Sequence, residues 1–492
     1  MDDGWGRGMS GQFDAEPDPL LEPVVQMDDV SGPVTPVRAA GRLLLRGRAP
    51  LDGWCELTGL WDGRGLQGTF VATCDEDIEC AVRAGVLVAE AVEVTDEELG
   101  TARFAVASGT SFELQSTLLD EEVKATFRPA TPEVHFAQPT DVTRHVTAHL
   151  LNVPAYAGAP TRVHAGSSSM RTFQRLDLTP GPWRVSIDSL KAWRFDRFGN
   201  GDEPDIVAAL KPFAELQRGG GHLITHVLRL ERGNGGSFGP KQARSVLDRL
   251  GVLLSFAFAS PARPLYRYGF ASPGRASWAV LDVAPPLSPA RGHADARGWL
   301  PQRDDLGTAS SSDVLNAGLS RMFDRWLTDS AAQDATVLQG SITQAVDWYV
   351  AAVGAFGRKE CIVLAQASLE VLAMYYLTQH LRLSKGGQEG LTVADQLSVV
   401  LASLRIPLDI PAGWADLAGR KSGGPRTGPA VVTAARNAVV HPRGRGVRPS
   451  PSQAAEEETL ALWYIEMILL RLLDYRGIYW DRLERASRSL DS

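Results

Sequence analysis

Short runs in which apolar and polar residues alternate fill the chain from about residue 37 to residue 286. Trp183-Arg184-Val185-Ser186-Ile187 is a clear case. A period of two is typical of a β-strand with one buried face. Many short strands separated by Gly, Pro and Asp predict a β-rich sandwich or barrel-like domain. The predicted strands are Arg42–Leu45, Trp54–Leu60, Gly68–Thr73, Arg103–Ala107, Phe112–Leu119, Val123–Phe127, Thr172–Leu178, Trp183–Ile187, Leu223–Leu230 and Trp278–Val283, with helices at Asp205–Gln217 and Pro240–Phe256.

The spacing of apolar residues becomes helical after Asp313. Leu338, Ile342, Val346 and Tyr349 recur every three or four residues, which is the spacing of one helix face. Helices throughout residues 313–485 predict an all-α bundle, so the fold class is α+β with more than one domain. The further predicted helices are Val314–Trp326, Arg358–Leu383, Thr392–Leu404, Val431–Val440 and a last one carrying Leu460, Trp463, Tyr464, Met467 and Leu470.

Four segments follow from these patterns. Residues 1–36 are acidic and rich in Gly and Pro, so we expect a disordered tail. Residues 37–286 form the β-rich domain, which we interpret as a sensor or recognition module. Residues 287–312 are rich in Pro, Gly, Ala and Ser and are expected to be a linker. Residues 313–485 form the helical bundle.

Composition and charge indicate a soluble globular protein without a membrane span. The 492-residue chain has 22% charged residues and a net charge of −8, which excludes a surface uniformly coated with cations but not a local basic groove. The most apolar segments, Cys361–Leu377 and Leu460–Leu473, are interrupted by charged residues, and the tail lacks the apolar core of a signal peptide. Four cysteines without CxxC spacing predict neither a disulfide framework nor a structural zinc, so we expect a cytoplasmic protein.

One stretch carries candidate chemistry: Ala435-Arg436-Asn437-Ala438-Val439-Val440-His441-Pro442. Arginine offers a planar, permanently charged fork that suits a phosphate. Histidine ordinarily titrates near neutral pH, and asparagine both donates and accepts hydrogen bonds. Proline disfavours helical backbone in the residue before it, so His441 is freed from the helical register and can reach the same cleft as Arg436. These three side chains suffice for phosphodiester chemistry without a metal.

The Arg-x4-His spacing alone is not specific, because the chain contains it twice. The second copy runs from Arg144 to His149 in a segment with strand-like alternation. An odd separation in a strand places two side chains on opposite faces, so we interpret this copy as structural. The first copy differs in lying at the end of a helix.

The segment around the first copy is basic. No acidic residue occurs between Asp416 and Glu456. We predict that cations in this segment track an RNA backbone. They are Arg420, Lys421, Arg443, Arg445 and Arg448, beside Arg436 itself.

The stretch resembles the HEPN family, whose hallmark is an arginine, then Asn, Asp or His, three residues, and a histidine on a helical bundle. Arg436, Asn437 and His441 match that pattern. The whole chain looks like the ApeA-like antiphage proteins, with a looser match at Leu228-Arg229-Leu230-Glu231-Arg232. The resemblance implies a metal-independent endoribonuclease without cofactor, with its site composed at a homodimer interface of the bundle. It implies a regulated toxin in abortive-infection defence against phage.

Since a ribonuclease of little selectivity would be lethal when always active, we expect residues 37–286 to gate the bundle. The trigger would be an unidentified phage-derived component or small molecule. Two other functions remain open: a catalytically silent HEPN scaffold that binds partners, and a β-domain that binds carbohydrate or peptide while the bundle dimerises it. A structural role for Arg436 and His441 also remains open, as does an ion pair between Glu370 and Arg436.

Other candidate features in the β-rich region have simpler interpretations. Gly219-Gly220-Gly221 precedes a strand rather than a helix, so a turn is favoured over a phosphate loop. His222 and His226 share a strand face without a third ligand, so no metal site is expected. The aromatic cluster that begins at Trp183 is interpreted as core rather than as a ligand platform.

Overall fold

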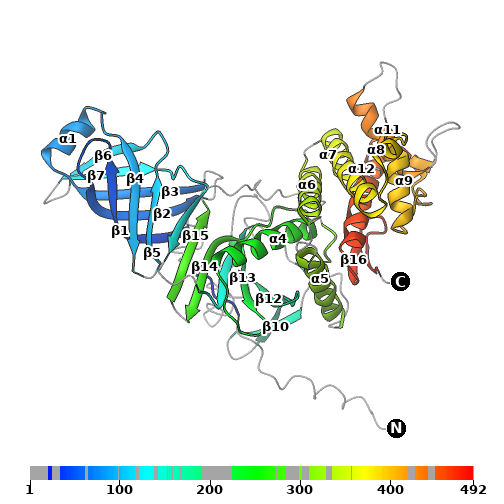
Figure 1. Ribbon diagram of the computed structural model, residues 1–492, viewed down its shortest axis with the longest axis horizontal. Helices are drawn as coiled ribbons and strands as arrows, with labels where there is room; N and C mark the ends of the chain where they lie inside the picture. Colours follow the sequence, from blue (N-terminus) through cyan, green and yellow to red (C-terminus); the bar gives the residue numbers. More distant parts are fainter. Residues whose placement is uncertain are drawn as a thin grey trace, which may run out of the picture.

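A computed structural model describes most of the chain. The described residues are 20–24, 34–60, 65–97, 99–116, 121–137, 142–151, 153, 156, 159–165, 169–190, 224–272, 275–282, 298–301, 310–328, 335–355, 357–418, 427–441 and 449–490. A β-rich region precedes a helical region, so the α+β class is confirmed (Figure 1). The predicted helix Asp205–Gln217, the glycines 219–221, His222 and the aromatic residues Trp193, Phe195 and Phe198 lie outside the described residues.

Fifteen strands form one antiparallel sheet, in the order β10-β11-β12-β13-β9-β14-β15-β8-β5-β4-β1-β2-β3-β7-β6. The strands are β1 (Val34–Leu45), β2 (Leu51–Leu60), β3 (Gly65–Thr73), β4 (Ala89–Asp96), β5 (Gly100–Ala105), β6 (Ser111–Ser116), β7 (Glu121–Phe127), β8 (Glu133–Ala137), β9 (His145–Leu151), β10 (Ala159–Ala165), β11 (Ser169–Leu178), β12 (Trp183–Ser189), β13 (Ile224–Arg232), β14 (Leu265–Ser272) and β15 (Arg275–Asp282). A separate hairpin near the C-terminus pairs β16 (Ile478–Asp481) with β17 (Ala486–Ser489).

The first strands curl into a partly closed barrel, at the far side of the molecule from the C-terminal helical bundle (Figure 1). Val106, just after β5, bridges Pro129, just after β7, which brings the two ends of the run β5-β4-β1-β2-β3-β7 together. Leu43, Phe70 and Val123 are fully buried in the core of this part. The barrel-like expectation therefore describes this half of the sheet, whereas the other half continues as an open sheet.

The helices are α1 (Glu76–Arg83), α4 (Pro240–Phe258), α5 (Ser310–Thr328), α6 (Ala335–Val353), α7 (Arg358–Tyr375), α8 (Lys385–Glu389), α9 (Val393–Ser403), α10 (Ala415–Ala418), α11 (Gly428–Val440) and α12 (Pro451–Leu472). A π-helical turn, Tyr376–His380, extends α7. Together α7 and this turn are long and apolar enough to cross a membrane by length and composition. Just over half of the apolar window is buried in the bundle, which is typical of a core helix.

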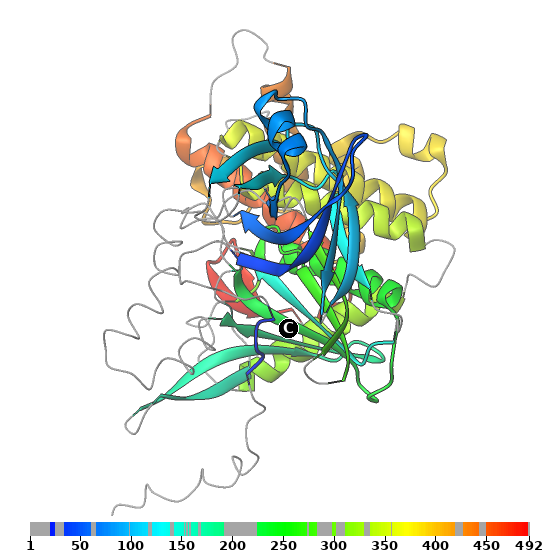
Figure 2. The same cartoon turned by 90° about the vertical axis from the view of Figure 1, so that its left-hand side faces the viewer.

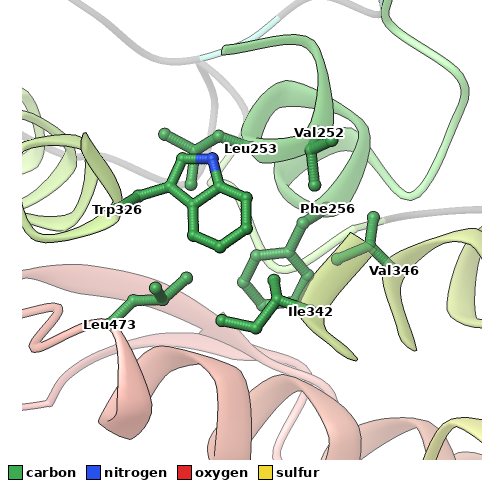
Figure 3. A pocket seen from close by; sticks show the side chains of 7 residues that line it. All are labelled: Val252, Leu253, Phe256, Trp326, Ile342, Val346 and Leu473. Carbon is green, nitrogen blue, oxygen red and sulfur yellow. The ribbon is translucent and has the colours of Figure 1, made fainter. Parts of the chain in front are cut away.

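The sheet and the bundle share one hydrophobic core. Helix α4 packs on the open half of the sheet and contacts α5 and α6 (Figure 1). Phe256 of α4 has its ring centroid 5.4 Å from that of Trp299 and 5.7 Å from that of Tyr349 in α6. A small apolar pocket remains between α4, α5, α6 and the end of α12 (Figure 3). Its lining residues are Val252, Leu253, Phe256, Trp326, Ile342, Val346 and Leu473.

Three predicted segments differ from the structure where it describes them. The segment 313–485, expected to be all-α, also contains strand β16. In the expected linker, Trp299 is fully buried, and its carbonyl accepts a hydrogen bond of 2.7 Å from Trp480 N in the C-terminal hairpin. An indole of that area is more stable in a core than in water, despite the Pro- and Gly-rich surroundings. In the expected tail, residues 20–24 lie on the sheet, because Leu21 and Val24 pack against its core. Local composition does not report such contacts.

Candidate active site at the end of helix α11

Helix α11 carries the predicted motif and begins where the sequence permits close packing. Thr427 occupies the N-cap position and Pro429 lies in the first turn, where its missing N–H is not needed. Gly428 N donates to Leu408 O at 2.8 Å. A Cβ at Gly428 would lie 2.8 Å from Cζ of Tyr464 and still closer to its hydroxyl. Glycine therefore lets α11 approach α12 closely at this point.

The three motif residues gather at the last turn of α11. Arg436 Nη1 donates to Asn437 Oδ1 at 3.1 Å. His441 N donates to Asn437 O at 2.8 Å. His441 is the C-cap, with φ −122° and ψ 68°, so its backbone has left the helical conformation. The predicted release of His441 from the helical register is confirmed.

The outer face of α11 presents the motif to solvent. Val431, Val432 and Ala435 form the buried stripe toward the bundle. Since each residue turns a helix by about 100°, Asn437 lies roughly opposite that stripe and Arg436 beside it. Asn437 and His441 are exposed and Arg436 is half-buried. Val440, on the same outer side, is an exposed apolar residue with 42% of its surface accessible.

Helix α11 contacts both α12 and α7. Gly428 at the start of α11 lies against Tyr464, well along α12. Arg358, the first residue of α7, donates to the carbonyl of Pro451 in the first turn of α12. Arg358 and Lys359 are cations in a first helical turn, where the helix dipole disfavours positive charge.

The predicted RNA-contacting cations fall outside the described residues. Arg420, Lys421, Arg443, Arg445 and Arg448 are all in this class. The two ends of the acid-free segment are described, and they meet: Leu417 N donates to the Glu456 carboxylate at 3.0 Å. Burial, with the nearby charge of Asp416, raises the pKa of Glu456. The acid-free segment, which includes α11, therefore begins and ends at neighbouring points of the bundle.

Glu370 has a different partner from the one proposed as an alternative. It accepts from Gln366 Nε2 at 3.2 Å within α7, whereas Arg436 pairs with Asn437. No ion pair joins Arg436 to a carboxylate among the residues that the structure describes. The guanidinium remains available to an anion from outside the chain.

The second Arg-x4-His copy is structural where it is described. Arg144 is exposed just before β9, while His149 within β9 is fully buried. Its ring bonds Tyr266 O at 3.0 Å, and burial lowers its pKa to about 4. His226 is likewise buried, contacts Thr225 Oγ1 at 3.0 Å and stacks on Tyr156. Within the described ranges, no group of three or more His, Cys, Asp or Glu gathers as a metal site.

The chain is similar to proteins named for YopA. A family model for the YopA C-terminal domain matches residues 335–491, and one for the YopA central domain matches residues 205–291. The SPbeta prophage-derived uncharacterized protein YopA of Bacillus subtilis (strain 168) is 25% identical over 276 residues. The match covers 56% of this chain and 58% of that relative, so it spans less than two thirds of the relative's length. No solved structure matches. None of these matches names an activity or a HEPN protein, so the predicted ribonuclease stays a prediction.

Proposed function

We propose that the chain is a metal-independent endoribonuclease of the HEPN type, with a composite site built on Arg436, Asn437 and His441 from two subunits. The observation that carries the proposal is their placement together on the solvent face at the last turn of α11, joined by two hydrogen bonds. An arginine without a carboxylate partner among the described contacts is a ready phosphate ligand. An exposed histidine five residues further on, at the C-cap of the same helix, would supply proton transfer.

The reaction uses the nucleophile that RNA itself carries. His441 of one subunit accepts the proton of the ribose 2′-hydroxyl, and the 2′-oxygen attacks the adjacent phosphorus. The bond from phosphorus to the 5′-oxygen breaks, and the partner's His441 donates a proton to that leaving oxygen. The products are a 2′,3′-cyclic phosphate and a 5′-hydroxyl. Arg436 neutralises the non-bridging oxygens as charge develops on them.

The proposal needs a dimer, because each α11 contributes one histidine and the reaction needs both an acceptor and a donor. A two-fold axis places two copies of one motif in one cleft. The exposed Val440 beside the motif supports pairing along this face, because contact with a second copy would remove an apolar side chain from water. We place the dimer contact at the outer face of α11 for this reason.

The shared core gives the proposed gating a physical route. Phe256 of α4 and Trp326 of α5 line one pocket with Ile342 of α6 (Figure 3), and α6 packs on α7 and α12. A trigger that shifts the sheet would move α4 and, through the packed helices, the relation of the two subunits. A displacement of about 1 Å at a two-subunit site costs on the order of 100-fold in rate.

The test uses purified full-length protein, generic single-stranded RNA and a denaturing gel. We expect cleavage by the wild type that persists in EDTA, spares DNA, and falls about 10²–10⁴-fold in His441→Ala. His135→Ala is the matched control, because His135 is also exposed and lies far along the sequence in β8. His149→Ala is unsuitable as a control because His149 is buried. Full activity in His441→Ala, or loss of activity in EDTA, contradicts the mechanism. RNA binding without any cleavage by the wild type fits both the silent scaffold and a gated enzyme without its trigger.

A further inference from the structure

Residues 20–24, Leu-Leu-Glu-Pro-Val, cross the open half of the sheet as an extended strap. Leu21 N donates to Asp188 Oδ2 at 2.8 Å, and Val24 N donates to His149 Nε2 at 3.3 Å. The strap appears in Figure 2 as a short dark-blue trace beside the strands. Residues 20–24 make no backbone-to-backbone bond with any described strand, so the strap is not itself a strand of the sheet.

The two acceptors belong to one row of side chains across neighbouring strands. The strand registers align Arg175 (β11), Asp188 (β12), Val227 (β13), His149 (β9) and Leu265 (β14), one residue from each strand. Directly opposed residues share a face of the sheet. Asp188 and His149 are two strands apart, about 10 Å, and three residues of extended chain also span about 10 Å. The spacing of the two acceptors therefore fits N–H donors at positions i and i+3 of an extended peptide.

Each acceptor also contacts a second partner, which orients it toward the strap. Arg175 donates from Nε and Nη2 to the two oxygens of Asp188, each at 2.6 Å, and both residues are buried. Asp188 Oδ2 thus accepts from Arg175 and from Leu21 together. Because His149 Nδ1 faces the carbonyl of Tyr266 at 3.0 Å, it carries the ring proton, and Nε2 presents its lone pair to Val24 N–H.

The remaining features of the strap match the same i, i+3 pattern. Leu21 and Val24 pack against the core that contains Val227 and Leu265, while Glu22 between them is exposed. Pro23 has no N–H to satisfy and keeps Glu22 in extended backbone. Within four consecutive residues, the site thus contacts the apolar side chains and accepts hydrogen bonds from the backbone N–H groups of Leu21 and Val24.

From this geometry we propose that the row Arg175–Asp188–Val227–His149–Leu265 is a peptide-binding groove, with the strap as its displaceable internal occupant. The external ligand is an extended segment of another protein with the pattern apolar-x-Pro-apolar. A ligand of this kind regenerates both hydrogen bonds when it replaces the strap, so no buried acceptor is left unsatisfied. The inference is independent of the ribonuclease, because peptide binding is measured without RNA.

The experiment measures binding of a fluorescein-labelled peptide of residues 17–27 to the full-length chain by fluorescence anisotropy. In the protein, Leu21→Asp with Val24→Asp weakens the internal strap and leaves the groove unchanged. We expect the peptide to bind this variant at least tenfold more tightly than the wild type, whose attached strap competes. Peptides N-methylated at Leu21 or at Val24 should bind about 10- to 100-fold more weakly, because each lacks one donor.

The matched control is the peptide N-methylated at Glu22, whose N–H has no acceptor among the described residues; it should bind like the unmodified peptide. Equal affinity of the three methylated peptides, or no binding to the strap variant, overturns the proposal. If the variant does not fold, hydrogen exchange on the wild type tests whether the peptide displaces the strap. Excess peptide should then speed exchange of the Leu21 and Val24 amides, and unchanged exchange at saturating peptide rejects displacement.

Discussion

The backbone N–H of His441 donates to the carbonyl oxygen of Asn437 at 2.8 Å, while the side chain of Asn437 accepts from Arg436 at 3.1 Å. Asn437 thus connects the residue that would transfer protons with the residue that would bind phosphate. Its backbone and its side chain each make one of the two bonds. A change of its side chain alone should therefore alter Arg436 without releasing His441.

Asn437→Asp tests that separation. A carboxylate beside Arg436 would pair with the guanidinium and compete with phosphate, so RNA affinity should fall. The log–log salt slope should decrease by about 0.7, the value for one lost contact to a single strand. Affinity titrations at several salt concentrations give the slope. Asn234→Asp adds the same charge at an exposed turn of the β-rich region and should leave the slope unchanged; an equal decrease would indicate a general charge effect.

Gly428→Ala should destabilise the bundle by about 1–3 kcal/mol, because the new methyl would overlap Tyr464. The buried Tyr464 hydroxyl has no partner among the described atoms. Adding Tyr464→Phe should therefore recover part of the loss, because the ring carbon Cζ would still lie 2.8 Å from the new methyl. Gly340→Ala in α6 is the control: its Cβ meets open space, and removing a helical glycine should stabilise by about 0.5–1 kcal/mol. Denaturant melts measure all three; additive losses in the double variant would argue against the overlap.

Arg482→Met should cost about 3–5 kcal/mol, because it leaves Glu466 buried without a counter-charge. Arg482, in the turn of the C-terminal hairpin, donates to Glu466 Oε1 at 2.6 Å, and Tyr349 Oη donates to the same oxygen at 2.5 Å. Glu466→Gln added to Arg482→Met removes the charge but keeps an acceptor for Tyr349, so stability should largely return. A double variant as unstable as Arg482→Met would assign the loss to packing of the arginine instead.

Acidification should destabilise the fold between about pH 6.5 and pH 4. Burial lowers the pKa of His149 to about 4 and that of His226 to about 3, so unfolded chains bind protons that the native state does not. The stabilisation from the two neutral histidines is therefore fully present above pH 6.5. As pH decreases below that value, the free energy of unfolding falls by about 1.4 kcal/mol per pH unit for each histidine. Asp282 opposes this below its pKa of about 6, which burial raises, because its native form binds the extra proton.

The contribution of one histidine to the pH dependence is obtained by comparing a variant with the wild type. His226→Gln should make the dependence shallower by about 1.4 kcal/mol per pH unit over that window, since one titrating group is removed. Asn234→Gln, at an exposed turn and without a titrating side chain, is the comparison that should keep the wild-type slope. Unfolding free energies at pH 7, 6 and 5 give the slopes, and identical slopes in wild type and His226→Gln would contradict the assignment.

Trp299→Ala should lower the free energy of unfolding by about 3–5 kcal/mol and loosen the sheet and the bundle together. Trp299 lies 4.9 Å from Tyr475 and 5.4 Å from Phe256 between ring centroids, so it contacts both regions. Trp54→Ala, at a side chain with 47% exposure in β2, should change stability by less than about 0.5 kcal/mol. Hydrogen exchange in α4 and α12 should increase together in Trp299→Ala. An increase in one helix alone would show that Trp299 does not couple the stability of the sheet to that of the bundle.

The sequence by itself determined the elements whose side-chain period is strong. Strands such as Trp183–Ile187 and helices such as Pro240–Phe256 were predicted because local alternation records which face is buried. It also placed Arg436 and Asn437 at the end of a helix, because Pro442 limits the backbone before it. It failed at β14, where buried residues on both faces leave little alternation.

Only the tertiary structure decided which distant residues meet. Trp299 in a Pro-rich segment and Leu21 in an acidic tail have no local signal, because their burial depends on partners far along the chain. The two Arg-x4-His copies differ for the same reason. Strand β9 places His149 in the core while Arg144, just before the strand, is exposed, whereas a helix end leaves His441 exposed. Residue spacing specifies a side-chain direction only after the backbone geometry is known, and packing determines what that direction faces.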